Sequence, residues 1–250
     1  MKLTNRRFFY LQIAAHMGLV YLLFVGEMHQ ILVTLGIASF ILLFSSTIMY
    51  HRYLSHRSWN APKWFEIFST CIGIFSFTGS SIIRTLSHRY HHAFSDTEKD
   101  PHSPRYNGIF YTYFPMLREN NYNPMLVKDL LSDKFHRTIH EYYLTIIVST
   151  IAISCMIIGP LWTIILLVAP GAVCWTNISL CNIACHWGKK DALIKQNKLL
   201  AWLTFGEGYH QHHHDSPTDP NFGQDKIDPG YVAIRLILFL DNLNKPSTRI

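Results

Sequence analysis

Four long apolar segments divide the sequence into membrane-spanning and polar parts. Each approaches the roughly 20 helical residues that cross a bilayer, and the segments are 8–25, 31–50, 142–158 and 161–181. Short connections, 26–30 and 159–160, join them in pairs. Because a helix satisfies its own backbone hydrogen bonds in lipid, the pattern predicts two antiparallel helical hairpins that form a four-helix stem.

Lysine and arginine residues lie on one side of this predicted stem. They flank the outer ends of the spans, whereas the two short connections contain neither. Cationic residues near membrane ends tend to stay in the cytoplasm. The sequence therefore predicts an integral, multi-pass membrane protein with both termini in the cytoplasm. Segments 51–141 and 182–250 would form a cytoplasmic cap, within a single domain of residues 1–250.

Two shorter apolar stretches belong to the predicted cap. Residues 64–78 contain one charged residue, Glu66, and are short for a span. We expect them to dip into the membrane or to lie along its surface. Residues 231–240 are expected to form an amphipathic or partly inserted helix. The whole chain is thus predicted to be all-α.

The composition favours a membrane protein over a soluble one. Of the 250 residues, 49% are hydrophobic and only 15% are charged, which is unusual for soluble domains. The formal net charge of +6 comes from basic residues scattered among apolar blocks, so nucleic-acid binding is not expected. The five cysteines include no Cys-x-x-Cys pair and lie in apolar stretches, so no disulfide is needed.

Most of the 15 histidines gather into clusters in the predicted cap. Neutral imidazole is the commonest protein metal ligand, so such clusters indicate a metal site. The first cluster contains His51 and His56, which are about 140° apart on an ideal α-helix. These two side chains converge only if the helix ends or bends between them.

Two further clusters have the spacing of one helical face. Residues i, i+3 and i+4 lie within an arc of about 100°, and this spacing occurs at 88, 91 and 92 and again at 210, 213 and 214. His212 lies about 200° around the helix from His210, so we expect it outside the metal site. Glu207, three positions before His210, either orients that imidazole or shapes the Gly-Glu-Gly turn.

A lone histidine, His186, completes the candidate set. It follows Asn182 by four residues, so the amide lies on the same helical face and could bind a metal-bound water. Nine side chains are too many for one ion and suit two transition metals better than a closed zinc site. Ligand softness alone allows iron, copper, zinc or nickel. The nine candidate ligands are His51, His56, His88, His91, His92, His186, His210, His213 and His214.

One cluster taken alone is more often a surface or core feature than a metal site. Three clusters on the same predicted membrane face favour ligation. The histidines outside the clusters are expected to have structural roles, and they are His16, His29, His102, His136 and His140.

These motifs resemble the membrane-bound fatty acid desaturases, of the acyl-CoA (stearoyl-CoA-like, Δ9) type. The resemblance rests on His51-x4-His56, on the run at 88–92 followed by the sequence to Arg105, on Asn182-x3-His186 and on Gly-Glu-Gly-Tyr-His at 206–210. It extends from the second span to about Asp215. Gln211 and Ile183 depart from the usual Asn and the common Ser of the family, which leaves the substrate open.

The resemblance implies a fold shaped like a mushroom, with two iron ions in the cap. One ion would be held by His51, His56, His88, His92 and His213, and the other by His91, His186, His210 and His214. Asn182 would reach the second ion through water. The implied reaction uses O2 to insert a cis double bond into a fatty acyl chain, carried by coenzyme A or by a glycerolipid.

The electron donor and the substrate site follow from the same resemblance. No His-Pro-Gly-Gly haem signature occurs, so we expect a separate donor such as ferredoxin or cytochrome b5. An apolar tunnel between the helices would hold the acyl chain, with Trp175, Ser179, Phe77 and Trp202 as candidate lining residues. The headgroup would lie at the cytoplasmic surface among membrane lipids. Arg84, Lys189 and Lys190 could meet it there, although positive-inside placement explains these residues equally well.

Two alternatives remain open from the sequence. The same dimetal platform could hydroxylate a lipid chain or form an acetylenic bond. A histidine-rich metal transporter or sensor would place polar residues at bilayer depth, where the spans hold few apart from His16 and Asn177. Ligands confined to the cap favour the enzyme.

Overall fold

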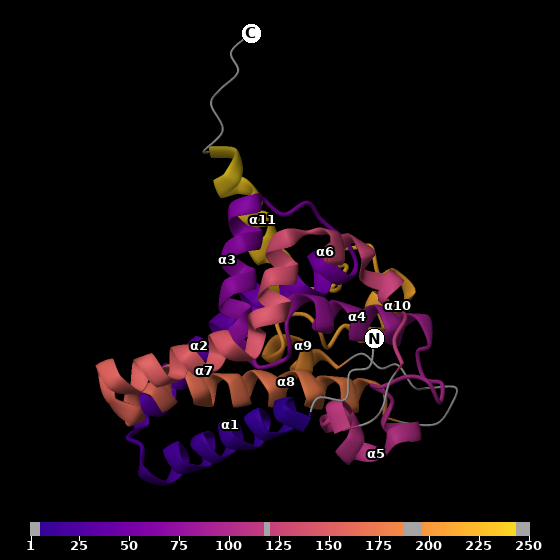
Figure 1. The fold of residues 1–250 in the computed structure, drawn as a ribbon. Coiled ribbons are helices and arrows are strands. Elements are labelled where there is room, and N and C mark those ends of the chain that lie inside the picture. Colours follow the sequence, from indigo (N-terminus) through magenta and orange to yellow (C-terminus); the bar gives the residue numbers. More distant parts are fainter. Residues whose placement is uncertain (1–5, 118–120, 188–196, 244–250) are drawn as a thin grey trace.

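The computed structural model describes residues 6–117, 121–187 and 197–243. These residues fold into helices and connecting loops with no β-strand among them. The predicted all-α class is therefore confirmed for the described ranges. Figure 1 shows long helices packed side by side as a stem, with shorter helices gathered at one end as a cap.

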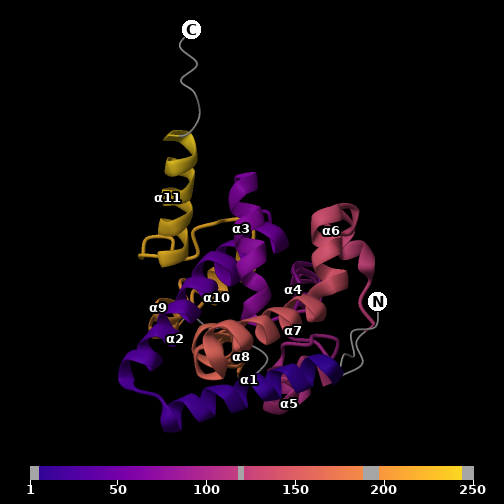
Figure 2. The ribbon, with the colours of Figure 1, turned by 60° about the vertical axis from the view of Figure 1, so that its left-hand side comes forward.

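The stem consists of two helical hairpins. In the first, α1 (Arg6–Val25) is followed by α2 (Met28–Ile41), which continues without interruption into η1 (Leu42–Ser55). In the second, α7 (Lys134–Thr163) is followed by η5 (Ile164–Val168) and α8 (Ala169–Cys185). Helices α1 and α2 both pack against α8, and Figure 2 shows α8 between them.

Glycines mark the turns of both hairpins, as the short connections predict. Gly26 lies between α1 and α2, and its N–H donates to Leu22 O at 2.8 Å. Gly159 adopts φ 81° and ψ 162° inside α7, a conformation that favours glycine. This break divides the long apolar helical stretch Lys134–Cys185 into two arms, and α7 and α8 fold back on each other in Figure 1.

The outer face of the stem exposes large apolar side chains. Phe24, Met156 and Ile157 are 85%, 78% and 76% exposed. A soluble monomer rarely presents such a surface, whereas a lipid-facing helix requires it. The stem therefore has the surface of a membrane protein.

The cap is built from the segments between and after the hairpins. Its longer helices are α3 (Lys63–Gly73), α4 (Ser81–Ala93), α5 (Pro104–Tyr113) and α11 (Pro229–Leu243). Its shorter helices are η2 (Ile74–Ser76), η3 (Pro115–Leu117), η4 (Pro124–Val127), α6 (Lys128–Ser132), α9 (Lys198–Leu203) and α10 (His210–Asp215). The predicted stretch 64–78 becomes α3 and η2, and the expected amphipathic helix at 231–240 lies within α11.

Helices α3 and α4 meet at a sharp corner. The segment containing α3 and η2 is bent by 83° from α4. Phe77 in the corner has φ 55°, and the Ser80 side chain caps α4 by accepting from Ile83 N–H. An N-cap hydroxyl satisfies one of the free N–H groups at a helix start. The corner thus starts α4 at a fixed point and sets which way its histidines face.

A buried ion pair joins the end of η1 to the start of α11. Arg52 is fully buried, and its two terminal nitrogens donate to Asp228 at 2.9 and 3.1 Å. The same guanidinium donates to the carbonyl of Pro220 at 2.6 Å and lies 3.9 Å above the ring of Phe222. Asp228 also accepts from the N–H of Tyr231 in α11. The pair holds the loop after α10 against η1.

Removal of one partner of this pair should destabilise the protein strongly. We expect Arg52→Met to lower the free energy of unfolding by about 3–5 kcal/mol, because Asp228 would remain buried without its cation. The exposed pair between Arg57 and Asp129 provides a matched control, and Arg57→Met should cost about 0–1 kcal/mol. Thermal unfolding in detergent measures both, and equal losses would contradict a special role for Arg52.

Candidate metal centre

The first two histidines are brought together by an unusual helix. The segment η1 is a π-helix, in which backbone bonds run from residue i to residue i+5. The N–H of His56 donates to the carbonyl of His51 at 3.2 Å, and their rings lie 5.1 Å apart. The helix also ends at Ser55, as the spacing requires. The π-helical winding also brings His51 and His56 together, and the spacing did not predict it.

The five histidines of the first group surround one point. Each offers a ring nitrogen, and all five nitrogens lie within 4.8 Å of one another. The Nε2 atoms of His56 and His88 are 2.7 Å apart, and Nε2 of His213 lies 3.0 Å from Nε2 of His51. The group contains His51, His56, His88, His92 and His213. Its members come from η1 and its end, from α4 and from α10.

A second group of four lies beside the first. Nε2 of His210 is 2.7 Å from Nε2 of His186 and 3.1 Å from Nε2 of His214. The group contains His91, His186, His210 and His214. The ring of His92 in the first group stacks on the ring of His214 at 4.3 Å, so the two groups are in contact. Their membership is the division that the family resemblance implies.

The spacing on α4 and α10 explains why each helix serves both groups. Residues four apart lie almost above one another, whereas the residue three along points to the side of that line. On α4 the pair His88 and His92 belongs to the first group and His91 to the second. On α10 the pair His210 and His214 belongs to the second group, and His213 to the first.

Carboxylates hold the outer nitrogens of these rings. Nδ1 of His91 lies 2.8 Å from Asp100, and Nδ1 of His186 lies 3.0 Å from Asp96. Nδ1 of His51 contacts the carboxylate of Glu207. A carboxylate at Nδ1 fixes the tautomer in which Nε2 is free to bind a metal. The inward-facing nitrogens are therefore arranged as donors.

Glu207 does not have the predicted partner. Its carboxylate faces His51 of the first group and lies 3.9 Å from Nε of Arg52. Only its backbone carbonyl reaches Nδ1 of His210, at 3.3 Å. The reason is that the Gly-Glu-Gly turn directs the side chain across to η1, while α10 begins three residues later. The sequence spacing alone did not indicate this contact between Glu207 and His51.

Asp96 and Asp100 were not among the predicted site residues. Both lie in the loop after α4, and Asp100 is fully buried and also accepts from the N–H of His102. A sequence signal was present, because three acidic residues, Asp96, Glu98 and Asp100, follow the second histidine cluster within eight positions. Such residues commonly hold the outer nitrogens of ligating histidines.

Burial keeps the clustered imidazoles neutral. It lowers the pKa of His92 to about 4 and the pKa of His56 to about 2. For His88 and His91, burial lowers the pKa well below the ordinary value of 6.5. Neutral imidazole is the form that binds metal. Nine nitrogen donors in two groups fit two transition-metal ions and make a closed tetrahedral zinc site a poor fit.

The other histidines lie outside both groups. Nε2 of His212 contacts Asp219 at 3.0 Å, and its Nδ1 accepts from Gln224. His136 bonds to Ser81 and to Glu66, and so links α7 to α4 and α3. His136, Glu66 and Asp133 form a third, mixed group. Lys63 already pairs with both of its carboxylates, so that group acts as a structural link.

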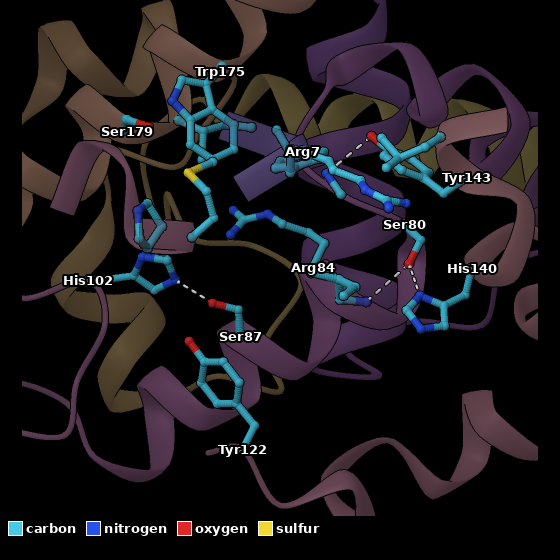
Figure 3. Close-up of a pocket in the computed structure, with 18 of the residues that line it drawn as sticks. Arg7, Ser80, Arg84, Ser87, His102, Tyr122, His140, Tyr143, Trp175 and Ser179 are labelled. Atoms are coloured by element: carbon cyan, nitrogen blue, oxygen red, sulfur yellow. Dashed lines mark hydrogen bonds between the residues drawn. The ribbon is translucent and has the colours of Figure 1, made fainter. Parts of the chain in front are cut away.

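A cavity of about 320 Å³ lies between stem and cap, and none of the nine clustered histidines is among its lining residues. Trp175, Ser179, Arg84 and Asn182 all line it, and Figure 3 shows Trp175 and Ser179 on one side of Arg84. A second, smaller cavity of about 30 Å³ reaches His51, His88 and His210. Both cavities share Arg84, Ile178 and Asn182, so the larger one ends beside the histidines.

Four of the predicted substrate contacts lie away from the two cavities or outside the described residues. Trp202 is 56% exposed on α9 and lines neither cavity. Phe77 is buried and packs against Gly171 of α8. Apolar character alone does not distinguish a cavity wall from core or surface, so the sequence could not assign these two residues to either. Lys189 and Lys190 lie outside the described residues.

Comparison with known proteins identifies the class. The sequence model of the fatty acid desaturase family matches residues 29–231, so the chain belongs to this family, and the predicted resemblance is confirmed. It is 30% identical to an acyl-CoA 5-desaturase of Anemone leveillei over 79% of this chain and 65% of that protein. It is 33% identical to the chloroplastic palmitoyl-monogalactosyldiacylglycerol delta-7 desaturase of Arabidopsis thaliana, over 67% of this chain and 48% of that protein.

A third relative has the predicted Δ9 specificity in its name. The Delta-9 acyl-lipid desaturase 2 of Arabidopsis thaliana is 28% identical over 76% of this chain and 66% of its own length. The chain thus spans between about half and two thirds of the length of these three relatives.

The neutral histidines should make the stability of the metal-free protein depend on pH. Between about pH 6.5 and 4 the unfolded histidines take up protons, while folded His56, His88, His91 and His92 do not. The unfolded state then binds more protons, so the free energy of unfolding falls as the pH decreases through this window. Thermal unfolding of metal-free protein at pH 7.5 and pH 5 tests this, and an equal Tm at both would contradict it.

Proposed function

We propose that the protein is a desaturase that uses O2 to insert a cis double bond into a fatty acyl chain. The observation that carries the proposal is the pair of histidine groups at the end of a largely apolar cavity, in a chain of the fatty acid desaturase family. Neither a histidine-rich transporter nor a sensor needs such a cavity beside its ligands. Product analysis separates desaturation from hydroxylation and acetylenic-bond formation, the alternative reactions of the same platform.

Two iron ions are the proposed cofactors. One would be held by His51, His56, His88, His92 and His213, and the other by His91, His186, His210 and His214. Asn182 lines both cavities, where its amide would hold a water between the cavity and the second group. Bound iron supplies the oxidising power toward O2 and an unactivated methylene that protein side chains lack.

The chain's own residues position and isolate the reactants. Asp96, Asp100 and Glu207 hold the outer nitrogens of His186, His91 and His51, so the inner nitrogens need no reorientation when metal binds. Trp175 is fixed by its indole N–H, which donates to Tyr113 O at 3.1 Å. Its ring then forms a rigid wall that holds one segment of the acyl chain against the metal groups and excludes water.

Membership of the family also supports proposals for the acyl carrier, the electron donor and the location of the protein. The acyl carrier would be coenzyme A or a glycerolipid, and the relatives include named examples of both classes. Electrons would come from a separate donor such as ferredoxin or cytochrome b5. The protein would be a single desaturase domain in the membrane, with the cap and both termini in the cytoplasm.

Product formation tests the activity. We expect expression in a host that lacks unsaturated fatty acids to yield a new double bond, located by mass spectrometry. His214→Ala should lower product at least about 100-fold, because a group that holds metal loses a ligand. His212→Ala should retain most product, since His212 bonds only to Asp219 and Gln224. Equal loss in both variants would contradict the ligand assignment.

Metal affinity tests the carboxylate contacts without turnover. Asp100→Asn should weaken iron binding about 10–100-fold, because Nδ1 of His91 loses its charged partner. Asp219→Asn is the matched control, since Asp219 contacts the ring of His212 in the same way. Competition with a chelator, followed by iron analysis of the protein, measures both. Unchanged affinity in Asp100→Asn would contradict the proposed role of Asp100.

A further inference from the structure

Arg84 lies in the wall between the two cavities. It is one of the few residues that line both the cavity of about 320 Å³ and the smaller one beside His51, His88 and His210. The sequence led us to expect Arg84 at the cytoplasmic surface. It is instead partly buried inside the protein, and Figure 3 shows its side chain extended among the residues that line the cavity.

The guanidinium of Arg84 has no acceptor in the part of the chain that the structure describes. Arg52, Arg57 and Arg89 each donate to an aspartate, whereas no side-chain hydrogen bond or ion pair joins the Arg84 guanidinium to any described residue. Glu207 interacts electrostatically with this charge, but its carboxylate contacts Nδ1 of His51 and lies 3.9 Å from Nε of Arg52. An arginine stays charged in proteins, and a charge at such a site is costly unless a ligand provides the partner.

The rest of the cavity fits an alkyl chain with one anionic or carbonyl end. Its walls include Phe8, Ile83, Met116, Leu144 and Trp175. Among its described lining residues the cations are Arg7 and Arg84, and the one carboxylate is Glu141, which is exposed. The charge balance therefore favours an electronegative group, and Arg84 is the cation that is common to both cavities.

The position of Arg84 on α4 sets where that group would lie. Arg84 precedes His88 by four residues, so both side chains leave the same face of the helix about 6 Å apart along its axis. An oxygen bound by Arg84 would therefore lie close to the first histidine group. The apolar walls would then hold the alkyl tail.

We propose that Arg84 is a specificity-determining residue that binds the acyl oxygen of the substrate, as a carboxylate, thioester or ester. The acyl end of the chain then lies where the two cavities meet, and its distance from the metal groups determines which carbons react. This inference rests on the proposed function. It identifies the group that sets the distance from the acyl end to the reacting carbons.

Binding measurements test the contact without turnover. Purified full-length protein, without added metal and in detergent, is titrated with palmitate, hexadecyl phosphate and hexadecane. Arg84→Met should weaken palmitate binding at least about tenfold, because a hydrogen bond to a charged group is lost. Hexadecane binding should not change, which also shows that the variant is folded. Arg84→Lys should retain most of the palmitate affinity.

The controls separate other roles of Arg84. Arg57→Met removes an arginine that pairs with Asp129 outside the cavity, and it should bind all three ligands like the parent. Equal loss of palmitate and hexadecane in Arg84→Met would overturn the proposal, because Arg84 would then shape the cavity. Unchanged palmitate binding would also overturn it. A loss confined to hexadecyl phosphate would assign Arg84 to a phosphate headgroup and overturn the acyl-oxygen contact.

The same variants distinguish this inference from the proposed function. The binding experiment gives its answer even if the protein forms no double bond in any host. Where the parent forms one product, Arg84→Met should form a mixture of double-bond positions, because the acyl end is no longer held. A single unchanged position would overturn the role of Arg84 in setting the reacting carbons.

Discussion

The metal centre depends on the buried ion pair between Arg52 and Asp228. Arg52 follows His51 directly and donates to the carbonyls of Phe205 and Pro220 as well as to Asp228. These two carbonyls bracket the segment that carries three of the nine clustered histidines. An ion pair with several acceptors in a low-dielectric interior has one favourable arrangement. It therefore fixes two parts of the chain that the sequence separates by more than 150 residues.

In the site around this pair, the inner and outer ring nitrogens of the imidazoles have different surroundings. The inner nitrogens approach one another to 2.7 Å in both groups, which places them around a common point in each group. The outer nitrogens of His51, His91 and His186 face carboxylates, which make the rings better donors. The fold thus holds the ring nitrogens in an arrangement that a bound metal would complete.

The sequence predicted the parts of this structure that depend on local pattern. Apolar length identified the hairpins, Gly159 marked a turn, and i, i+4 spacing separated His212 from His210 and His214. It did not predict the π-helix, because i to i+5 bonding depends on how Leu42–Ser55 packs against α3 and α4. Nor could it place Glu207 against His51 or Arg84 inside the protein, since both contacts are set by segments that meet only after folding.

The continuity of α2 with η1 has a mechanical consequence. Met28–Ser55 is one helix without a break, so no joint separates its lipid-facing start from the imidazoles at its end. A long span adapts to bilayer thickness by changing its tilt. A change in the tilt of this helix would therefore move His51. His186 lies at the end of a different helix, α8. Because α4 and α10 each carry ligands of both groups, bilayer thickness would act on where His51 and His186 lie within their groups and not on the spacing between the groups.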